Sequence, residues 1–465
     1  MQTERSTPAN TTAVTPKPRS LLANGRYLRL WLGQAVSYVG DFVFDTTLVV
    51  WIAADLARGQ SWAPLAVSGA LAAALIPTFL IGPFAGVFVD RANQQRLMLA
   101  MDLLRAALIA LLIPLSGVVP LPFIPGGRLA TVPLLVTIYA IVFLAGVCSQ
   151  FFNPARTAII TDVVPSAQLA QATGFGQAAY SGAVLIGPPL AAPLLFAFGP
   201  QWALLVNALS FAASFLLILS VRLPRRTAAA GAGAAEIEGA GARRSFARDW
   251  MQGARFFFGS RVLVTIFIVG ILAGLVDGTF NSAGIFFAQQ NLHIPAAYYG
   301  FLGSAFAGGT LVGSIGAGLL AERLGLTRVF AAALTVLGVG LVVLSRMTSF
   351  VPGLAVLFIC GLMQAGVSLT ISPILFKVTP RELLGRMLSL LNPVIVGTNL
   401  LAVALCGYLI SVVLVGFRAA LAGVTFGPLD TLYGVMGLLA IAAGLFAALN
   451  LRGVRLEPPA EASAA

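Results

Sequence analysis

Charged side chains are scarce in this sequence of 465 residues. Only 9% of the residues are charged, 58% are hydrophobic, and the mean hydropathy is +0.94. A soluble globular protein carries roughly 25% charged residues, because water must solvate its surface. The shortage of charge therefore excludes an ordinary soluble protein and predicts a chain whose exterior is covered mostly by lipid.

Residues that hold metals or perform covalent catalysis are also few. The one histidine, His293, is predicted to lie in an outer loop, and the three cysteines, Cys148, Cys360 and Cys406, fall in apolar stretches without ligand spacing. No nucleophile elbow and no glycine loop with a lysine is present. We therefore expect no metal, no cofactor and no enzyme activity. A membrane enzyme would need a catalytic constellation, and a receptor would need a soluble signalling domain.

Long apolar stretches fill most of the chain instead. They run to about 20 residues, which suits membrane-spanning helices, whereas barrel strands are about 10 residues of alternating polarity. The fold class that we predict is an all-α membrane protein with twelve transmembrane helices. The expected helices cover 30–54, 64–88, 97–118, 131–152, 172–198, 202–221, 262–288, 298–320, 327–345, 352–376, 388–415 and 431–450.

The only long polar interval divides these helices into two sets of six. We predict a disordered cytoplasmic tail over 1–25, a six-helix bundle over 26–221 and a cytoplasmic linker over 222–260. The second part of that linker has aromatic and basic residues at helical spacing, which predicts an amphipathic helix on the membrane surface. A second six-helix bundle follows over 261–451, and a cytoplasmic tail over 452–465.

Basic residues give the orientation of the predicted helices. With the N-terminus inside, 23 of the 28 Lys and Arg residues, Arg156 among them, fall in cytoplasmic segments and four in outer loops. This bias predicts a multi-pass protein of the plasma (inner) membrane with both termini cytoplasmic. The net charge of +12 is spread over short loops without a nucleic-acid-binding motif, so no nucleic-acid partner is expected.

Two patterns recur in both halves. One pattern ends the second and eighth predicted helices at an offset of 232, and the other lies in the first and seventh at an offset of 236. Two matches at nearly one offset indicate duplication of a six-helix unit, which places a substrate site between the halves. The first pattern is Gly86-x3-Asp90-Arg91-x4-Arg96 and Gly318-x3-Glu322-Arg323-x4-Arg328; the second aligns Asp41 with Asp277 and Asp45 with Asn281.

The first pattern resembles a signature of the major facilitator superfamily, and the fifth predicted helix carries a second likeness. Its residues Gly174-x8-Ala183-x3-Gly187-Pro188-x2-Ala191-Ala192 resemble the family's antiporter signature, with three glycines replaced by alanine. The stretches LRLWLGQAVSYVGDFVFD and ARDWMQGARFFFGSR resemble the branch that contains macrolide-efflux and siderophore-export permeases. The resemblance implies two pseudo-symmetric six-helix bundles that act as a transporter.

Each of these two signatures has two possible interpretations, a role in gating or coupling and a purely structural role. Asp90 and Arg91 lie at the predicted cytoplasmic end, where an acid–base pair can lock the halves together; Arg91 and Arg96 would also satisfy the bias of basic residues alone. The small residues Gly174 and Gly187 and the helix-interior Pro188 fit a tight antiporter interface, or ordinary helix packing.

Acids inside predicted helices are the strongest chemical indication. Asp41 and Asp45 share one helix face roughly 18–24 Å from the boundary near Arg29, and Asp277 takes the matching place in the other half. A carboxylate at that depth costs at least a few kcal/mol, so such residues are usually functional. We expect Asp41, Asp45, Asp277 and Asn281 to line a cavity and to bind protons or substrate; Asp41 could instead bond to a helix end.

A further charged pair, Asp102 and Arg105, stands three residues apart in the third predicted helix. An internal ion pair is the simplest interpretation, and a place for Arg105 in a proton relay beside the cavity is the alternative. Antiporters of the superfamily often carry an arginine in their fourth helix, but 131–152 contains none. The resemblance therefore supports the fold more firmly than it supports proton coupling.

The function predicted from these features is proton-coupled export of hydrophobic or amphiphilic small molecules, such as drugs, by alternating access. Export of a siderophore or a lipid-like metabolite is the alternative. The expected partners are the small-molecule substrate, protons and the lipid bilayer, and we expect a monomer.

Overall fold

The computed structural model describes residues 21–118, 120, 129–222, 257, 259–379, 381–421 and 424–452, with backbone only for 381–390, 392, 421 and 424. Nearly all of the predicted linker with its amphipathic helix, and most of both predicted tails, lie outside the described residues. Leu21, within the predicted tail, is buried in a short 3₁₀ turn, η1 (Leu21–Ala23), so this end of the tail is folded.

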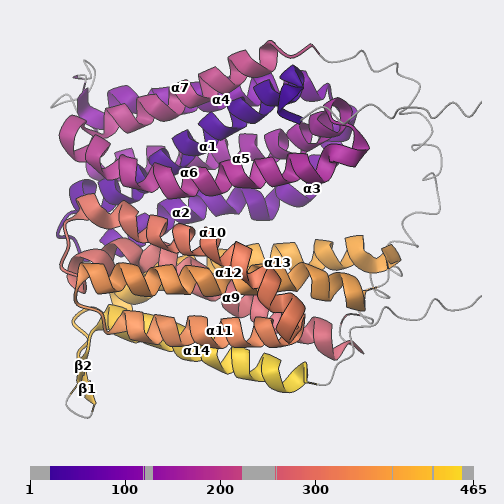
Figure 1. The fold of residues 1–465 in the computed structure, drawn as a ribbon. Helices are drawn as coiled ribbons and strands as arrows, with labels where there is room; N and C mark the ends of the chain where they lie inside the picture. Colours follow the sequence, from indigo (N-terminus) through magenta and orange to yellow (C-terminus); the bar gives the residue numbers. More distant parts are fainter. Residues whose placement is uncertain are drawn as a thin grey trace, which may run out of the picture.

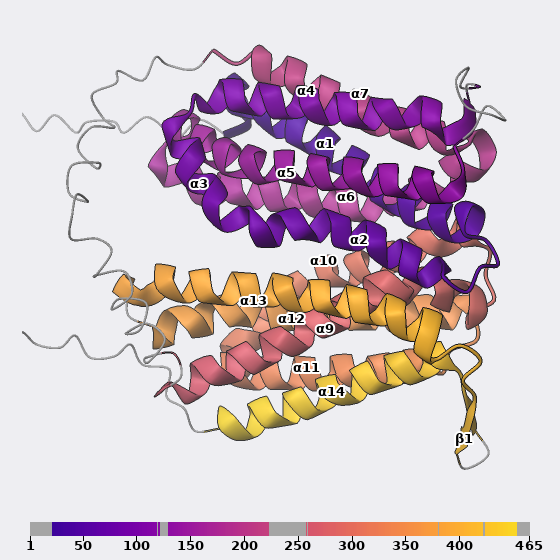
Figure 2. The ribbon, with the colours of Figure 1, turned by 180° about the vertical axis from the view of Figure 1, so that it is seen from behind.

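Helices form almost the whole of the N-terminal half (Figures 1 and 2). Their bounds after η1 are α1 (Gly25–Trp51), η2 (Ile52–Leu56), α2 (Ala63–Leu80), α3 (Gly82–Arg91), α4 (Gln94–Ile113), η3 (Pro114–Val118), α5 (Thr131–Val163), η4 (Ser166–Gln168), α6 (Leu169–Phe198) and α7 (Pro200–Leu219). Short π-helical turns, η2 and η3, end the first and third membrane crossings.

The C-terminal half repeats this plan with one addition, an antiparallel hairpin. Its elements are α9 (Arg261–Gln290), η6 (Ala296–Tyr298), α10 (Tyr299–Leu324), α11 (Leu326–Ser345), α12 (Phe350–Val378), α13 (Arg381–Tyr408), η7 (Leu409–Val413), β1 (Ala419–Leu421), β2 (Val424–Phe426) and α14 (Pro428–Asn450). The hairpin was not predicted, because its strands have only three residues each.

Two bundles lie one above the other in Figure 1, indigo to magenta for the first half and orange to yellow for the second. Within the described residues, twelve helices are long and apolar enough to cross a membrane. This confirms the predicted fold class. The start of α1 and the end of α14 lie at one end of the molecule, the terminal end, and the strands lie at the other, the hairpin end (Figures 1 and 2).

Several predicted boundaries are wrong; α13, for example, begins at Arg381 rather than at 388. Two of the differences bear on the site. The second predicted helix breaks at Ile81 into α2 and α3, because Pro83 at the start of α3 has no N–H with which to continue the helical ladder. The fourth crossing, α5, continues to Val163 as one helix. It therefore takes in Arg156, which the count of basic residues assigned to a cytoplasmic segment.

Close helix packing holds the second half together. A Cβ atom on Gly309 of α10 would clash with the backbone oxygen of Phe358 on α12, and one on Gly361 of α12 would clash with that of Phe306 on α10. Small residues allow this approach in membranes, where van der Waals contact drives much of the association between helices.

Candidate functional site

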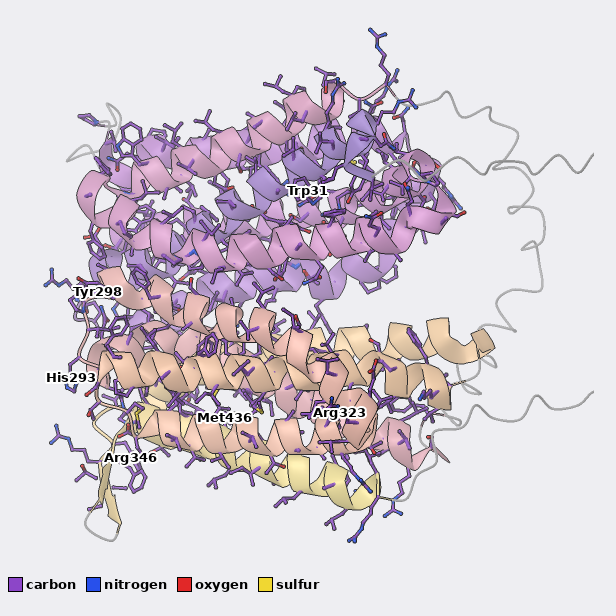
Figure 3. The ribbon with its side chains drawn as sticks, viewed as in Figure 1. Trp31, His293, Tyr298, Arg323, Arg346 and Met436 are labelled. Atoms are coloured by element: carbon purple, nitrogen blue, oxygen red, sulfur yellow. The ribbon has the colours of Figure 1, made fainter. Side chains whose placement is uncertain are left out.

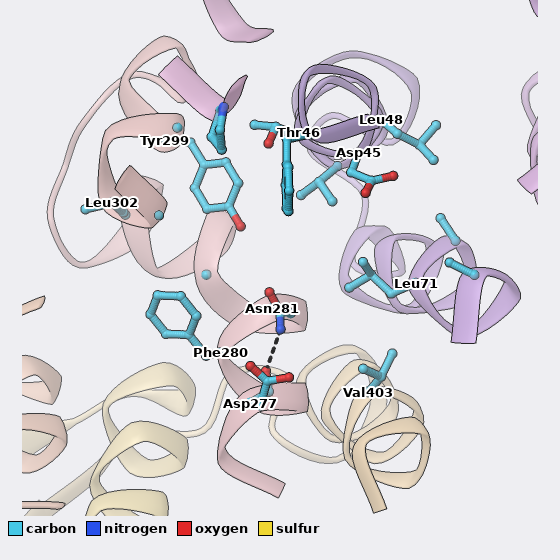
Figure 4. A pocket seen from close by; sticks show the side chains of 18 of the residues that line it. Asp45, Thr46, Leu48, Leu71, Asp277, Phe280, Asn281, Tyr299, Leu302 and Val403 are labelled. Atoms are coloured by element: carbon cyan, nitrogen blue, oxygen red, sulfur yellow. Dashed lines mark hydrogen bonds between the residues drawn. The ribbon is translucent and has the colours of Figure 1, made fainter. Parts of the chain in front are cut away.

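A cavity of about 330 Å³ lies between the two halves. Its walls come from α1, α2, α5 and α6 of the first half and from α9 to α14 of the second. Most of the lining is apolar, with Leu71, Phe280, Leu302 and Val403 among the side chains visible in Figure 4. A mostly apolar cavity with a few polar groups is the usual form of a small-molecule site.

Two of the predicted acids face this cavity from opposite halves. Asp45 comes from α1, and Asp277 comes from α9 with Asn281 one turn further on (Figure 4). The side-chain amide of Asn281 donates to the backbone oxygen of Asp277 at 2.9 Å, and the amide of Asn399 on α13 donates to the Asp277 carboxylate. Among the described residues, none donates a hydrogen bond to the carboxylate of Asp45. Of the two acids in the site, Asp277 therefore accepts a hydrogen bond from a described side chain and Asp45 accepts none.

Asn399 was missed by the sequence analysis. Its side chain lines the cavity next to Asp277, yet it belongs to neither repeated pattern. The one available signal was an amide in the middle of an apolar stretch, since polar groups at membrane depth are usually functional.

Asp41 and Arg105 do not line the cavity, contrary to expectation. Arg105 forms a buried ion pair with Asp102, as the spacing predicted, and its guanidinium lies between the rings of Phe152 and Phe211, 4.4 and 4.3 Å from their centres. Arg105 and Asp102 are therefore paired inside the first half, although the Nε atom of Arg105 is buried without a hydrogen-bond partner among the described residues. Asp41 has neither a hydrogen bond nor an ion pair through its side chain to another described residue.

The antiporter-like segment lies in α6, where α6 contacts both halves. A Cβ on Gly187 would lie 2.6 Å from the Cβ of Phe42 on α1. On the other side, the backbone oxygen of Pro188 faces Gly300 of α10 so closely that a Cβ there would clash with it. Gly174, near the terminal end of α6, has nothing within 4 Å of such an atom. Only the part of the segment toward the hairpin end is tightly packed.

Hydrogen bonds join the halves in the same region. Pro189 has no N–H, so the carbonyl of Leu185 four residues earlier lacks its helical donor. The hydroxyl of Ser304 on α10 donates to that carbonyl at 2.7 Å. A second link is the 2.5 Å hydrogen bond between the buried hydroxyls of Ser68 on α2 and Ser282 on α9. These contacts close the halves against each other toward the hairpin end.

The predicted gating residues, in contrast, are loosely packed and exposed. Gly86 and Gly318 have nothing within 4 Å of an added Cβ. The charged side chains are exposed, and none makes an ion pair with a described residue: Asp90, Arg91, Arg96, Glu322, Arg323 and Arg328. Figure 3 labels Arg323 near the end of α10, and His293, Tyr298 and Arg346 at the hairpin end. Among the described residues, the charged gating side chains therefore form no ion pair between the two halves in this conformation.

The sequence pattern of the Major Facilitator Superfamily matches residues 30–277 and, a second time, residues 266–465. The chain belongs to the major facilitator superfamily. Members of this family are transporters rather than enzymes, and this chain is accordingly a multi-pass membrane protein of the cell membrane.

Individual relatives are distant. Macrolide efflux protein A of Streptococcus pyogenes is 21% identical over 78% of this chain and 84% of its own length, and the protein of that name in Enterococcus faecalis is 22% identical over 68% and 92%. The crystal structure of an auto-inhibited POT family peptide transporter superposes with a TM-score of 0.67 at 13% identity, over 94% of this chain and 98% of that one. The structural likeness is one of fold.

Proposed function

We propose that this transporter exports hydrophobic or amphiphilic small molecules, coupled to proton entry, by alternating access. The observation that carries the proposal is the apolar cavity between the halves, with Asp45 on one wall and Asp277 on the other. The efflux names of the distant relatives agree with export. Large polar substrates such as sugars or phosphates usually need several Arg, Lys or Asn groups, and this lining has few.

The two acids have different roles in the proposal. A charged carboxylate among apolar side chains is costly unless something neutralises or hydrogen-bonds it. Asp45, which lacks a donor, is assigned the proton. Asp277, which the Asn399 amide holds in place, is assigned the orientation of a cationic or polar group on the substrate.

Alternation follows from the way the halves meet. The excess of basic residues in the loops of the terminal end favours a cytoplasmic position for that end, and the proposal takes the present conformation as inward-facing. In the opposite conformation, the acidic and basic side chains of the two gating patterns would pair at the terminal end while the contacts of Ser68 and Ser304 separate. A proton or a substrate shifts this balance only through unequal binding to the two states.

An efflux assay tests the proposal. Cells that express the chain are loaded with ethidium and other fluorescent lipophilic compounds, with and without a protonophore. We expect protonophore-sensitive efflux that Asp45→Asn abolishes and Asp55→Asn preserves. Asp55 is a matched control, because it lies outside the cavity and its side chain accepts a hydrogen bond from Trp51 that asparagine can also accept. Efflux that survives both the protonophore and Asp45→Asn would contradict proton coupling through this residue.

A second candidate is export of one compact metabolite, such as a siderophore or a lipid-like compound. The volume of about 330 Å³ favours it, because it is near the lower limit of roughly 300–1,000 Å³ for ligand pockets. Retention of the entire panel at the level of empty cells would favour this candidate over drug export.

A further inference from the structure

Arg156 lies against α1 rather than in a loop. Its Nη1 atom donates to the hydroxyl of Tyr38 at 2.8 Å, and its Cζ atom lies 5.8 Å from the centre of the Tyr38 ring. Arg156 is seven residues before the end of α5, and Tyr38 is 13 residues after the start of α1. These distances along the helices place the contact well inside the first half, on the terminal-end side of the cavity.

The guanidinium of Arg156 is only partly satisfied. Arginine is always charged and offers five N–H donors, of which the bond to Tyr38 uses one. Its Nε atom is buried and has no hydrogen-bond partner among the described residues, and no described carboxylate lies within ion-pairing distance. The Nε atom of Arg105 also lacks a described partner, but the charge of Arg105 is paired with that of Asp102. A charged residue within a membrane-spanning segment usually has a partner or a function, so the unpaired Arg156 indicates an anion from outside the chain.

A row of aromatic rings joins this guanidinium to the cavity. The Tyr38 ring lies edge-on to Tyr180 of α6 at 5.3 Å, and Tyr180 lies edge-on to Phe42 at 5.4 Å. Phe42 lines the cavity, and 42% of the surface of Tyr180 is exposed. Tyr38 and Asp45 are seven residues apart on α1, which is two turns or roughly 10 Å. A ligand that extends from the cavity along these rings would reach Arg156.

We propose that Arg156 and Tyr38 bind the anionic group, a carboxylate or a phosphate, of an amphiphilic substrate. This inference rests on the proposed function, since its ligand is the transported molecule. The free donors of the guanidinium form charge-assisted hydrogen bonds to the anion, and the Tyr38 hydroxyl, which accepts from Arg156, donates its own hydrogen. The ring faces of Tyr180 and Phe42 contact the apolar body. Among the transported amphiphiles, the site thus favours those that carry an acid group on the side facing the terminal end.

Two matched probes test this site in the purified full-length chain. The first, 1-pyrenebutyrate, is an anion, and the second, 1-pyrenebutanamide, is its neutral amide. Binding is measured by fluorescence anisotropy in nanodiscs of phosphatidylcholine, which contain no anionic lipid that could compete. Hydrogen bonds to charged groups contribute about 1.5–3 kcal/mol, so we expect the wild-type chain to bind the anion about ten- to a hundredfold more tightly than the amide.

Arg156→Gln is expected to remove that preference by weakening binding of the anion alone, with the Kd of the amide within about twofold of wild type. Arg156→Lys keeps the charge but not the planar fork, so we expect a partial loss. Tyr38→Phe keeps the ring and loses the hydroxyl, and we expect a smaller loss for the anion only. Arg418→Gln, an exposed arginine at the hairpin end, is the control and is expected to bind both probes as wild type does.

Equal binding of the two probes by the wild-type chain would overturn the inference without recourse to any variant. Equal weakening of both probes in Arg156→Gln would also overturn it, because it would show that Arg156 only ties α5 to α1. The proposed function fails in a different way, namely when cells that express the chain retain every compound of the efflux panel. Anion-selective binding through Arg156 could still be observed in that case.

Discussion

The individual acids and amides of the cavity show which functional residues a sequence can reveal. Asp45 and Asp277 were predicted from their depth in apolar stretches and from a repeated pattern that aligns Asp45 with Asn281 and Asp277 with Asp41, and both line the cavity. Asp41 satisfies the same criteria but does not line the cavity. Depth along a helix can be counted from sequence, whereas the direction of a side chain depends on the rotation of that helix against its neighbours. The end of the fourth crossing was predicted too early for a related reason, since nothing in the sequence marks how far α5 continues past 152.

The amide of Asn399 gives a residue-scale prediction about Asp277. Asn399→Ala removes the hydrogen bond to the Asp277 carboxylate, and bonds to charged groups contribute about 1.5–3 kcal/mol. We expect the KM for ethidium efflux to rise about tenfold or more, with sensitivity to the protonophore retained. Thr398→Ala is the neighbouring control, because the Thr398 hydroxyl donates to the carbonyl of Val394 in its own helix and to no other described residue. An unchanged KM in Asn399→Ala would remove Asp277 from substrate orientation.

Among the elements, α6 is the one whose position was best predicted from its sequence. Its glycine and proline pattern predicted a helix at the interface of the halves, and the structure places Gly187 against α1 and Pro188 against α10. Pro189 leaves the carbonyl of Leu185 without its helical donor, and Ser304 supplies a hydrogen bond instead. This partner could not be predicted, because Ser304 lies more than a hundred residues away and belongs to no motif. The break between α2 and α3 and the continuation of α5 to Val163 could not be predicted from hydrophobic periodicity either, because periodicity is least reliable at helix ends.

A methyl group at the contact of α6 with α10 tests the closure at the hairpin end. Gly300→Ala puts a Cβ against the backbone oxygen of Pro188, and neither backbone can give way cheaply. We expect this variant to fold but to disfavour the inward-facing state, with ethidium efflux reduced at least tenfold. Spin labels on the two halves, at positions near the hairpin end, are expected to report longer distances than in wild type.

Gly316→Ala is the matched control on the same helix, because an added Cβ there meets nothing within 4 Å. We expect it to retain wild-type distances and efflux. If Gly300→Ala behaved in the same way, the close contact of Gly300 with Pro188 would not determine the balance between the two states.

For the whole molecule, the sequence predicted the twelve crossings, their division into two sets of six and the membrane environment, because apolar length and charge placement are properties of the chain itself. The meeting of the halves was expected from the repeat. Which end is closed could not be predicted, since the same sequence must support both conformations. The contacts of Ser68 and Ser304 on one side, and the exposed charges of Asp90 and Glu322 on the other, which pair with no described residue, exist only in the folded arrangement.

Proton coupling through the cavity is the central claim, and transport in proteoliposomes tests it most directly. Purified wild-type chain, Asp45→Asn and Asp277→Asn are reconstituted, the membrane potential is clamped with potassium and valinomycin, and a pH gradient is imposed. We predict that the gradient drives ethidium transport by the wild-type chain. Asp45→Asn is expected to exchange ethidium across the membrane without responding to the gradient, while Asp277→Asn responds but requires more ethidium. Gradient-driven accumulation by Asp45→Asn equal to that of wild type would contradict the account.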